Sequence, residues 1–191
     1  MNYELQINKL PNKISGIYMA VDYHLNTDFI LNRMAKELGI IPDNGYDEHY
    51  NLREYKYHTT IIYAKFSKPL DLNNKLVQFK TKNGSSIFEK KKPKLQIPVK
   101  ILGVGFFDTE DGINFHLKVS SPFLLSEFKR AIQYGLPTDF PNYNPHITIK
   151  KSVTKEFKER MLKGEYKTIL QKYINATIYT NDEYIEVLDN K

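Results

Sequence analysis

Two histidines, each followed two positions later by a threonine, are the residues of this sequence whose types and spacing point to a reaction. They are His58 with Thr60, in the run HTTI, and His146 with Thr148, in the run HITI. Because residues i and i+2 of a β-strand lie on one face, each strand presents an imidazole beside a hydroxyl. Two imidazoles can divide general acid and general base catalysis, and the hydroxyls can donate hydrogen bonds to oxygens on which charge builds. This set suits cleavage of a phosphodiester beside a ribose 2′-hydroxyl, a reaction in which no step requires a metal ion.

The elements that must position the first pair begin with a run of β-forming residues over 15–23. Asn26–Asp28 then offers a helix N-cap, apolar residues follow at helical spacing, and Gly39 ends the helix. The aromatic and β-branched run 55–64 contains the first histidine and predicts a strand. The predicted order is therefore strand, helix, strand.

The second half of the chain repeats this order. Strands are predicted over 96–107 and 113–120, and Ser121 with Pro122 then starts a helix. The run 145–150 contains the second histidine and predicts the strand that closes the repeat. Such an echo predicts two similar units. If they pack about an approximate twofold axis, both His-x-Thr pairs reach one cleft with room for a phosphate.

The remainder of the chain predicts smaller elements that follow the second unit. They are helices over 155–162 and 165–173, and a hairpin-like pair of strands, 176–179 and 184–188, around Asn181-Asp182. No linker rich in Gly, Pro or Ser divides the chain, so we expect a single domain over residues 1–191.

The composition is typical of a folded domain, because 41% of the 191 residues are hydrophobic and 26% are charged. The chain has no cysteine, which excludes disulfides and thiolate metal sites. The net charge of +6 favours a phosphate-bearing partner. No apolar run reaches the roughly 18 residues of a membrane span, so we expect a cytoplasmic protein without a membrane partner. One basic stretch predicts a solvated loop whose simplest role is solubility; its members are Lys80, Lys82, Lys90, Lys91, Lys92 and Lys94.

One His-x-Thr tripeptide alone is a weak signal, since a strand histidine is more often a packed or surface residue. Two of them in matching contexts favour the catalytic interpretation over coincidence. The remaining histidines, His24, His49 and His116, are assigned structural or surface roles. A zinc site is a poor alternative, because no cysteine and no His-Glu-x-x-His helix accompanies the pair.

The two motifs, each after a strand and a helix, resemble those of the 2H phosphoesterase superfamily. Within it, GIYMAVDY, YKYHTTIIYAK and EYIEVLD are similar to the phage anti-CBASS phosphodiesterases, which degrade cyclic oligonucleotide alarm signals of bacterial immunity. The resemblance implies an α+β fold with two pseudo-symmetric lobes of antiparallel sheet, helices outside and a central cleft. We expect lobe one at about 14–66, lobe two at about 95–152, and C-terminal helices and a hairpin at about 153–189.

The same resemblance implies that His58, Thr60, His146 and Thr148 are catalytic and that no metal or other cofactor takes part. It also suggests that Tyr18 and Glu186 hold a nucleobase or ribose. From the residues alone, Tyr18 can stack on a base, but with 14 tyrosines in the chain a core or surface role is an equal alternative. Glu186 can accept a hydrogen bond from a base edge, and its alternative is a solvent-facing position on a strand.

The leading hypothesis is therefore cleavage of 3′–5′ bonds in a cyclic di- or trinucleotide by the adjacent 2′-hydroxyl, in the host-cell cytoplasm if the chain is phage-encoded. An RNA-processing enzyme acting on 2′,3′-cyclic phosphate ends or 2′–5′ linkages is the first rival. A non-enzymatic protein that sequesters nucleotides or RNA is the second. Base preference, ring size, the assignment of acid and base, the oligomeric state and the role of the insert 67–94 stay open.

Overall fold

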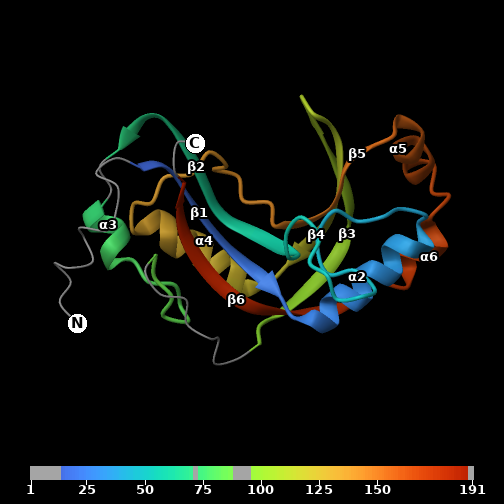
Figure 1. Ribbon diagram of the computed structural model, residues 1–191, viewed down its shortest axis with the longest axis horizontal. Coiled ribbons are helices and arrows are strands. Elements are labelled where there is room, and N and C mark those ends of the chain that lie inside the picture. Colours follow the sequence, from blue (N-terminus) through green and yellow to red (C-terminus); the bar gives the residue numbers. More distant parts are fainter. Residues whose placement is uncertain (1–13, 71–72, 88–95, 189–191) are drawn as a thin grey trace.

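The computed structural model describes residues 14–70, 73–87 and 96–188. Its centre is one six-stranded antiparallel sheet in the order β2-β1-β6-β3-β4-β5 (Figure 1). The strands are β1 (Ile14–Tyr23), β2 (His58–Leu70), β3 (Pro98–Thr109), β4 (Gly112–Ser120), β5 (His146–Val153) and β6 (Thr177–Leu188). The helices are α2 (Leu25–Glu37), α3 (Asn73–Gln78), α4 (Pro122–Gln133), α5 (Lys155–Leu162) and α6 (Lys167–Gln171). The predicted α+β class is confirmed.

The strands form where β-branched and aromatic residues alternate with partly exposed ones. In β5, Ile147 and Ile149 are fully buried, whereas His146 and Thr148 on the opposite face are partly exposed. The buried faces pack with apolar residues of α2 and α4, such as Leu31 of α2, into one core. Each fully buried aliphatic side chain of this kind contributes about 1.5–3 kcal/mol, so the core holds the face of β5 that carries His146 and Thr148 in a defined orientation.

β6 is a single continuous strand, and the predicted hairpin over 176–179 and 184–188 is wrong. Asp182, at the expected turn, continues the strand instead, and its backbone N–H donates to the Asp22 carboxylate at 2.7 Å. The C-terminal part of β6 pairs with β1, and its first residues pair with β3. β6 therefore joins the half β2-β1-β6 to the half β3-β4-β5 through a short ladder. The predicted lobe boundaries at 14–66 and 95–152 stay a prediction.

The sheet curves so strongly that its two edge strands, β2 and β5, come into contact (Figure 1). The hydroxyl of Thr59, which is fully buried, donates to the backbone carbonyl of His146 at 3.1 Å. The Tyr23 hydroxyl lies 2.7 Å from the Thr59 hydroxyl and donates to it, because Thr59 uses its own proton on His146. Curvature thus brings the two His-x-Thr strands together from opposite ends of the sheet.

The two helices that connect the repeated strands begin in different ways. The predicted N-cap of α2 at Asn26–Asp28 is wrong: His24 is the N-cap, and its Nδ1 accepts a hydrogen bond from the Asn26 N–H at 3.3 Å. The prediction for α4 is confirmed, with Ser121 as N-cap and Pro122 at the first position. The Ser121 hydroxyl, however, donates to the Pro98 carbonyl at 3.0 Å, so it anchors β3 instead of the helix.

The helix ends follow the sequence more closely. Gly39 and Gly135, at φ values of 74° and 89°, lie just beyond α2 and α4 in the left-handed region that glycine tolerates. In the tail, α5 has the predicted bounds 155–162, and α6 is shorter than the predicted helix 165–173. No helix in the described part of the chain is long and apolar enough to cross a membrane.

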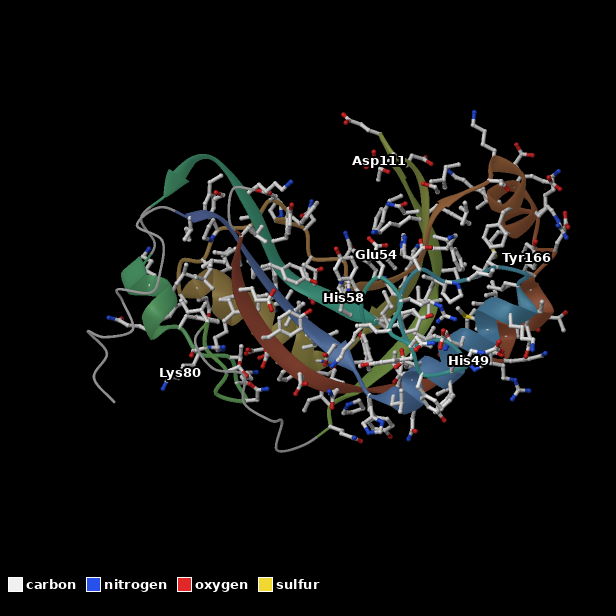
Figure 2. All side chains as sticks on the ribbon, in the orientation of Figure 1. His49, Glu54, His58, Lys80, Asp111 and Tyr166 are labelled. Carbon is white, nitrogen blue, oxygen red and sulfur yellow. The ribbon has the colours of Figure 1, made fainter. Side chains whose placement is uncertain are left out.

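The predicted basic loop is described only in part. Lys82 is exposed, but its ammonium group lies 3.9 Å from the carboxylate of Glu127, which is fully buried and also accepts the Lys82 backbone N–H at 3.1 Å. Figure 2 shows Lys80 near α3, at the end of the molecule, whereas His58 lies near its middle. The other members of the stretch lie outside the described residues; they are Lys90, Lys91, Lys92 and Lys94.

Candidate active site

The register between β2, β1 and β6 gathers one set of functional side chains on the face that carries His58. His58 is opposite Asp22 on β1, and Tyr18 of β1 is opposite Glu186 of β6. A bulge between Thr60 and Tyr63 keeps these two residues on one face. Together the side chains line a cavity of about 490 Å³, whose lining residues are Tyr18, Asp22, Tyr55, Lys56, His58, Tyr184, Glu186 and Leu188.

The imidazole of His58 is held in a defined tautomer. Its Nδ1 lies 2.9 Å from the backbone carbonyl oxygen of Lys56. A carbonyl oxygen can only accept, so Nδ1 carries the proton and Nε2 is left for chemistry. The rings of Tyr18 and Tyr55 meet the imidazole edge-on, with centroids 6.2 Å and 6.5 Å away. These contacts restrict the rotation of the ring.

The charges in the His58 cavity are largely compensated by neighbouring groups. Lys56 forms an ion pair with Asp22 at 3.2 Å, and Asp22 also accepts the N–H of Asp182. Burial raises the pKa of Tyr18, and hydrogen bonds with Thr60 and Tyr184 lower it by less. Tyr18 therefore stays protonated at neutral pH, and its hydroxyl is in contact with the first threonine motif.

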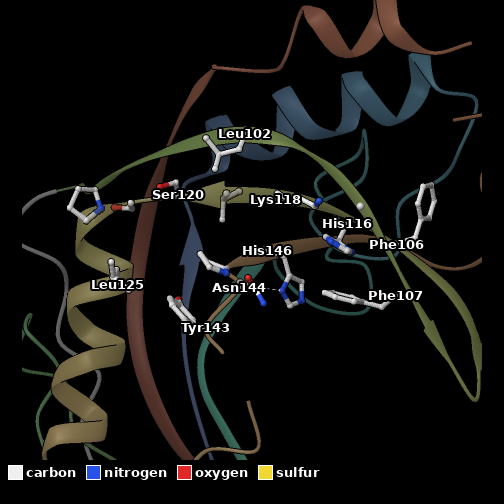
Figure 3. Close-up of a pocket in the computed structure, with 15 residues that line it drawn as sticks. Leu102, Phe106, Phe107, His116, Lys118, Ser120, Leu125, Tyr143, Asn144 and His146 are labelled. Carbon is white, nitrogen blue, oxygen red and sulfur yellow. Dashed lines mark hydrogen bonds between the residues drawn. The ribbon is translucent and has the colours of Figure 1, made fainter. Parts of the chain in front are cut away.

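The register between β5, β4 and β3 gathers a second set around His146. His146 is opposite Lys118 of β4, and Thr148 is opposite His116, which is in turn opposite Gly105 of β3. This face opens into a cavity of about 820 Å³ (Figure 3). Its lining residues are Leu102, Gly105, Phe106, Phe107, His116, Lys118, Val119, Ser120, Ser121, Pro122, Leu125, Tyr143, Asn144, Pro145 and His146.

His146 is oriented in the same way as His58. Its Nδ1 lies 3.0 Å from the backbone carbonyl oxygen of Asn144, which again is the residue two positions earlier. Nδ1 therefore carries the proton, and Nε2 is the free nitrogen. Burial lowers the pKa of His146, and the nearby charge of His58 lowers it further, while the hydrogen bond with Asn144 raises it. His146 is therefore neutral over a wider pH range than an ordinary histidine.

His116 belongs to this site, although the sequence assigned it a structural or surface role. It is buried, its ring stacks on Phe107 at 4.0 Å, and its centroid lies 5.2 Å from that of His146. Burial, followed by the charges of His146 and Lys118, lowers the pKa of His116 to about 4, so it is neutral at pH 7. Strand alternation is the signal that could have identified His116. Consecutive residues of β4 point to opposite faces, so His116 lies on the other face of the sheet from the buried Phe115.

Phe107 is a second residue of the site that the sequence did not indicate. Its ring meets His146 edge-on at 4.8 Å, yet 39% of the residue is exposed. An exposed aromatic ring at the edge of a polar site offers a surface on which a nucleobase can stack. A single phenylalanine among 11 in the sequence carries no signal of this kind.

The two histidine sites are neighbours, but each histidine lines its own cavity. The bond from Thr59 to the His146 carbonyl joins the two strands, and the charge of His58 influences the pKa of His146. The expectation that one phosphate contacts both imidazoles stays a prediction, as do the catalytic roles of Thr60 and Thr148 and the binding roles of Tyr18 and Glu186. Within the described ranges, no cluster of three or more His, Asp or Glu side chains is arranged to hold a metal ion.

Comparison with known proteins identifies similar sequences in phages. The family model described as "Anti-CBASS protein Acb1" matches residues 15–191. A protein of that name from Escherichia phage RB16 is 30% identical over 135 residues, which cover 71% of this chain and 62% of the relative. Another, from Salmonella phage S16, is 26% identical over 145 residues, covering 76% of this chain and 78% of the relative. The match thus spans less than two thirds of the RB16 protein.

Proposed function

This chain belongs to the anti-CBASS protein Acb1 family, and from that membership and the paired histidines we propose that it is a metal-independent phosphodiesterase. The substrate in this proposal is a cyclic di- or trinucleotide that signals in bacterial CBASS defence. The observation that carries the proposal is that the same kind of backbone hydrogen bond orients His58 and His146. In each, the backbone carbonyl two residues earlier accepts a hydrogen bond from Nδ1–H, and Nε2 is left to react.

We place the chain in the 2H phosphoesterase superfamily as a fold of two pseudo-symmetric lobes. Three features support this placement. The strand order lists β2-β1-β6 and then β3-β4-β5, so the His-x-Thr strands are at equivalent ends. Each histidine strand pairs with the strand that precedes the helix of its own repeat, β2 with β1 and β5 with β4. Finally, the curvature of the sheet brings the two equivalent ends into contact.

In the proposed reaction, the 2′-hydroxyl of the substrate attacks the adjacent phosphorus atom. His146 Nε2 takes the proton of that hydroxyl, because its lowered pKa keeps the imidazole neutral and able to accept. The bond to the 5′-oxygen breaks, and His58 donates a proton to that oxygen as it leaves. The products are a 2′,3′-cyclic phosphate and a free 5′-hydroxyl. Opening the cyclic phosphate with water then uses the two histidines in reversed roles.

The threonines stabilise the charge that builds on phosphorus-bound oxygens in this proposal. Thr60 and Thr148 lie two residues after the histidines and on the same strand faces, so their hydroxyls can donate to the non-bridging oxygens. Tyr18 and Glu186 face each other across β1 and β6 in the His58 cavity. In this proposal they hold the ribose or base of the nucleotide whose phosphate reacts.

The test is to incubate the protein, in excess EDTA, with cyclic dinucleotides, cyclic trinucleotides and RNA that ends in a 2′,3′-cyclic phosphate, and to separate the products by chromatography. We expect linear products from a cyclic oligonucleotide. Cleavage of the RNA ends alone would favour the RNA-processing alternative. Tight binding of a cyclic nucleotide without product would favour a sequestering protein. Loss of turnover in EDTA would remove the metal-independent mechanism. For substitutions of His58 and His146, the matched control is His49→Ala, in which an exposed histidine is removed.

A further inference from the structure

Lys118 lies in the active-site cavity without an assigned role. It is the cross-strand neighbour of His146 and lines the same cavity. Among the described residues that line this cavity, Lys118 is the only lysine, arginine, aspartate or glutamate. No carboxylate in the described part of the chain lies within 4 Å of its ammonium group. The cavity therefore contains a positive charge that no carboxylate of the described residues pairs.

The Lys118 side chain is directed away from β5 and across β3. A Cβ atom at Gly105 of β3 would lie 2.9 Å from Lys118 Cε and 2.5 Å from His116 Nε2. β4 lies between β3 and β5 in the sheet, so the lysine leans over the strand that is farther from His146. Figure 3 shows the side chain extending toward His116. Only the absence of a side chain at position 105 permits this arrangement.

The offset separates Lys118 from the reacting phosphate. β3 and β5 are two strands apart, which corresponds to roughly 10 Å at the usual strand spacing. A phosphate held between His146 and His58 lies on the β5 side of the cavity, toward β2. The cation over β3 is therefore placed for a different anionic group of the same substrate. The neighbouring His116 is neutral at pH 7 and does not add to the positive charge or compete for that group.

We propose that Lys118, lying over Gly105, forms a subsite for the second, non-reacting phosphate of a cyclic dinucleotide. This inference rests on the proposed function, because it takes the phosphate between the histidines to be the one that is cleaved. A cyclic dinucleotide carries two phosphates on opposite sides of its ring, so engagement of one places the other across the cavity. The subsite favours cyclic dinucleotides over single phosphodiesters through binding rather than through the chemical step.

The first test compares two probes, cyclic di-AMP with two phosphates and the linear dinucleotide ApA with one. Lys118→Met removes the charge and keeps the length of the side chain. Lys100→Met is the matched control, because Lys100 is exposed on β3 and does not line the cavity.

We expect Lys118→Met to raise KM for cyclic di-AMP by about tenfold, the usual effect of one charge-assisted contact. The loss in kcat/KM should be at least about fivefold larger for cyclic di-AMP than for ApA. The decline of kcat/KM with salt should also be weaker for the variant, because salt screens the attraction between the ammonium group and the phosphate. An equal loss on both probes, or no loss on either, overturns the proposal.

A second test measures binding in a background that does not turn over. Isothermal titration calorimetry with cyclic di-AMP compares His58→Ala/Lys118→Met with His58→Ala/Lys100→Met. We expect about tenfold weaker binding in the first protein. If the wild-type protein cleaves neither probe but this difference is present, the proposed function fails and the subsite stands. Equal affinities in the two double variants overturn the subsite, whatever the outcome of the turnover assays.

Discussion

The surroundings of His58 and His146 share one backbone design and differ in charge. Each imidazole donates its Nδ1 proton to the carbonyl two residues earlier, and each lies opposite a charged residue on the neighbouring strand. That residue is Asp22 beside His58 and Lys118 beside His146. Asp22 is paired with Lys56, whereas Lys118 has no carboxylate partner among the described residues. The residue opposite the histidine is therefore negatively charged in one half of the sheet and positively charged in the other.

The residues that line the two cavities also differ in charge. The cavity around His58 is lined by three tyrosines, two carboxylates and Lys56, whereas the larger cavity around His146 is lined by apolar and uncharged polar residues with Lys118 as its one lysine. A repeated strand and helix thus places the reactive groups alike, and the remaining side chains make the two sides unequal. A cyclic substrate whose nucleotides are chemically equivalent would still meet two different environments. In the proposed function, this difference lets one phosphate react while the other is only bound.

The largest expected effect tests the two histidines that the two halves of the sheet have in common. His58→Ala and His146→Ala should each lower kcat by about 10²–10⁴-fold, because each removes one of the two proton-transfer groups. The double variant should be little worse than either single variant, since the two groups act in one step. Single-turnover assays on a cyclic dinucleotide measure this. A large loss in only one of the two variants would show that the two halves do not share the chemistry.

The next effect concerns the hydroxyls that accompany the histidines. Thr60→Val and Thr148→Val should each lower kcat by about 10²-fold, the cost of one donor to a charged transition state. Thr60→Ser and Thr148→Ser keep the hydroxyl and should retain most activity, so they are the matched controls. Thr60 differs from Thr148 because it is also hydrogen-bonded to Tyr18. Thr60→Val should therefore raise KM as well. If the serine variants are as poor as the valine variants, packing rather than hydrogen bonding explains the loss.

A third effect concerns the contact between the two halves. Thr59→Val leaves the buried Tyr23 hydroxyl and the His146 carbonyl without this partner, which should lower the free energy of unfolding by about 1–3 kcal/mol. Urea unfolding followed by circular dichroism measures the change. Thr59→Ser retains the hydroxyl and should lose much less. Stability of Thr59→Val equal to that of the wild type would mean that the β2–β5 contact does not depend on this bond.

The smallest effect concerns the dependence of stability on pH. The pKa of His116 falls from about 6.5 in the unfolded chain to about 4 in the folded protein, because of its burial. Between these values the unfolded chain binds the proton and the folded protein does not, so stability falls as the pH falls from 6.5 toward 4. Wild type should lose about 1–2 kcal/mol more than His116→Gln between pH 7 and pH 5. Urea unfolding at the two pH values tests this.

The same buried environment can be observed without unfolding the protein. An NMR titration of the imidazole protons should place the midpoint of His146 below its ordinary value and should move it upward in His58→Gln, because the charge of His58 contributes to the shift. Parallel stability slopes for wild type and His116→Gln would instead mean that His116 is solvated. Such a result would contradict the buried position of His116 beside His146.

Much of the local structure follows from the sequence. The alternation of β5 and the positions of Ser121, Pro122 and Gly135 are short-range features, and all of them are present in the structure. The wrong hairpin prediction occurs where a distant residue competes with local preference. Asn181-Asp182 reads as a turn, but Asp182 finds a partner in Asp22 on another strand and the chain stays extended.

The sequence by itself determined that each histidine shares a strand face with a threonine, because alternation along a strand depends only on residues two positions apart. It also determined that this unit occurs twice. Only the tertiary structure decided that His116, Phe107 and Lys118 surround His146, and that the Thr59 hydroxyl joins β2 to β5. These contacts depend on register and sheet curvature, which are set by packing between segments far apart in the chain and have no local pattern in the sequence.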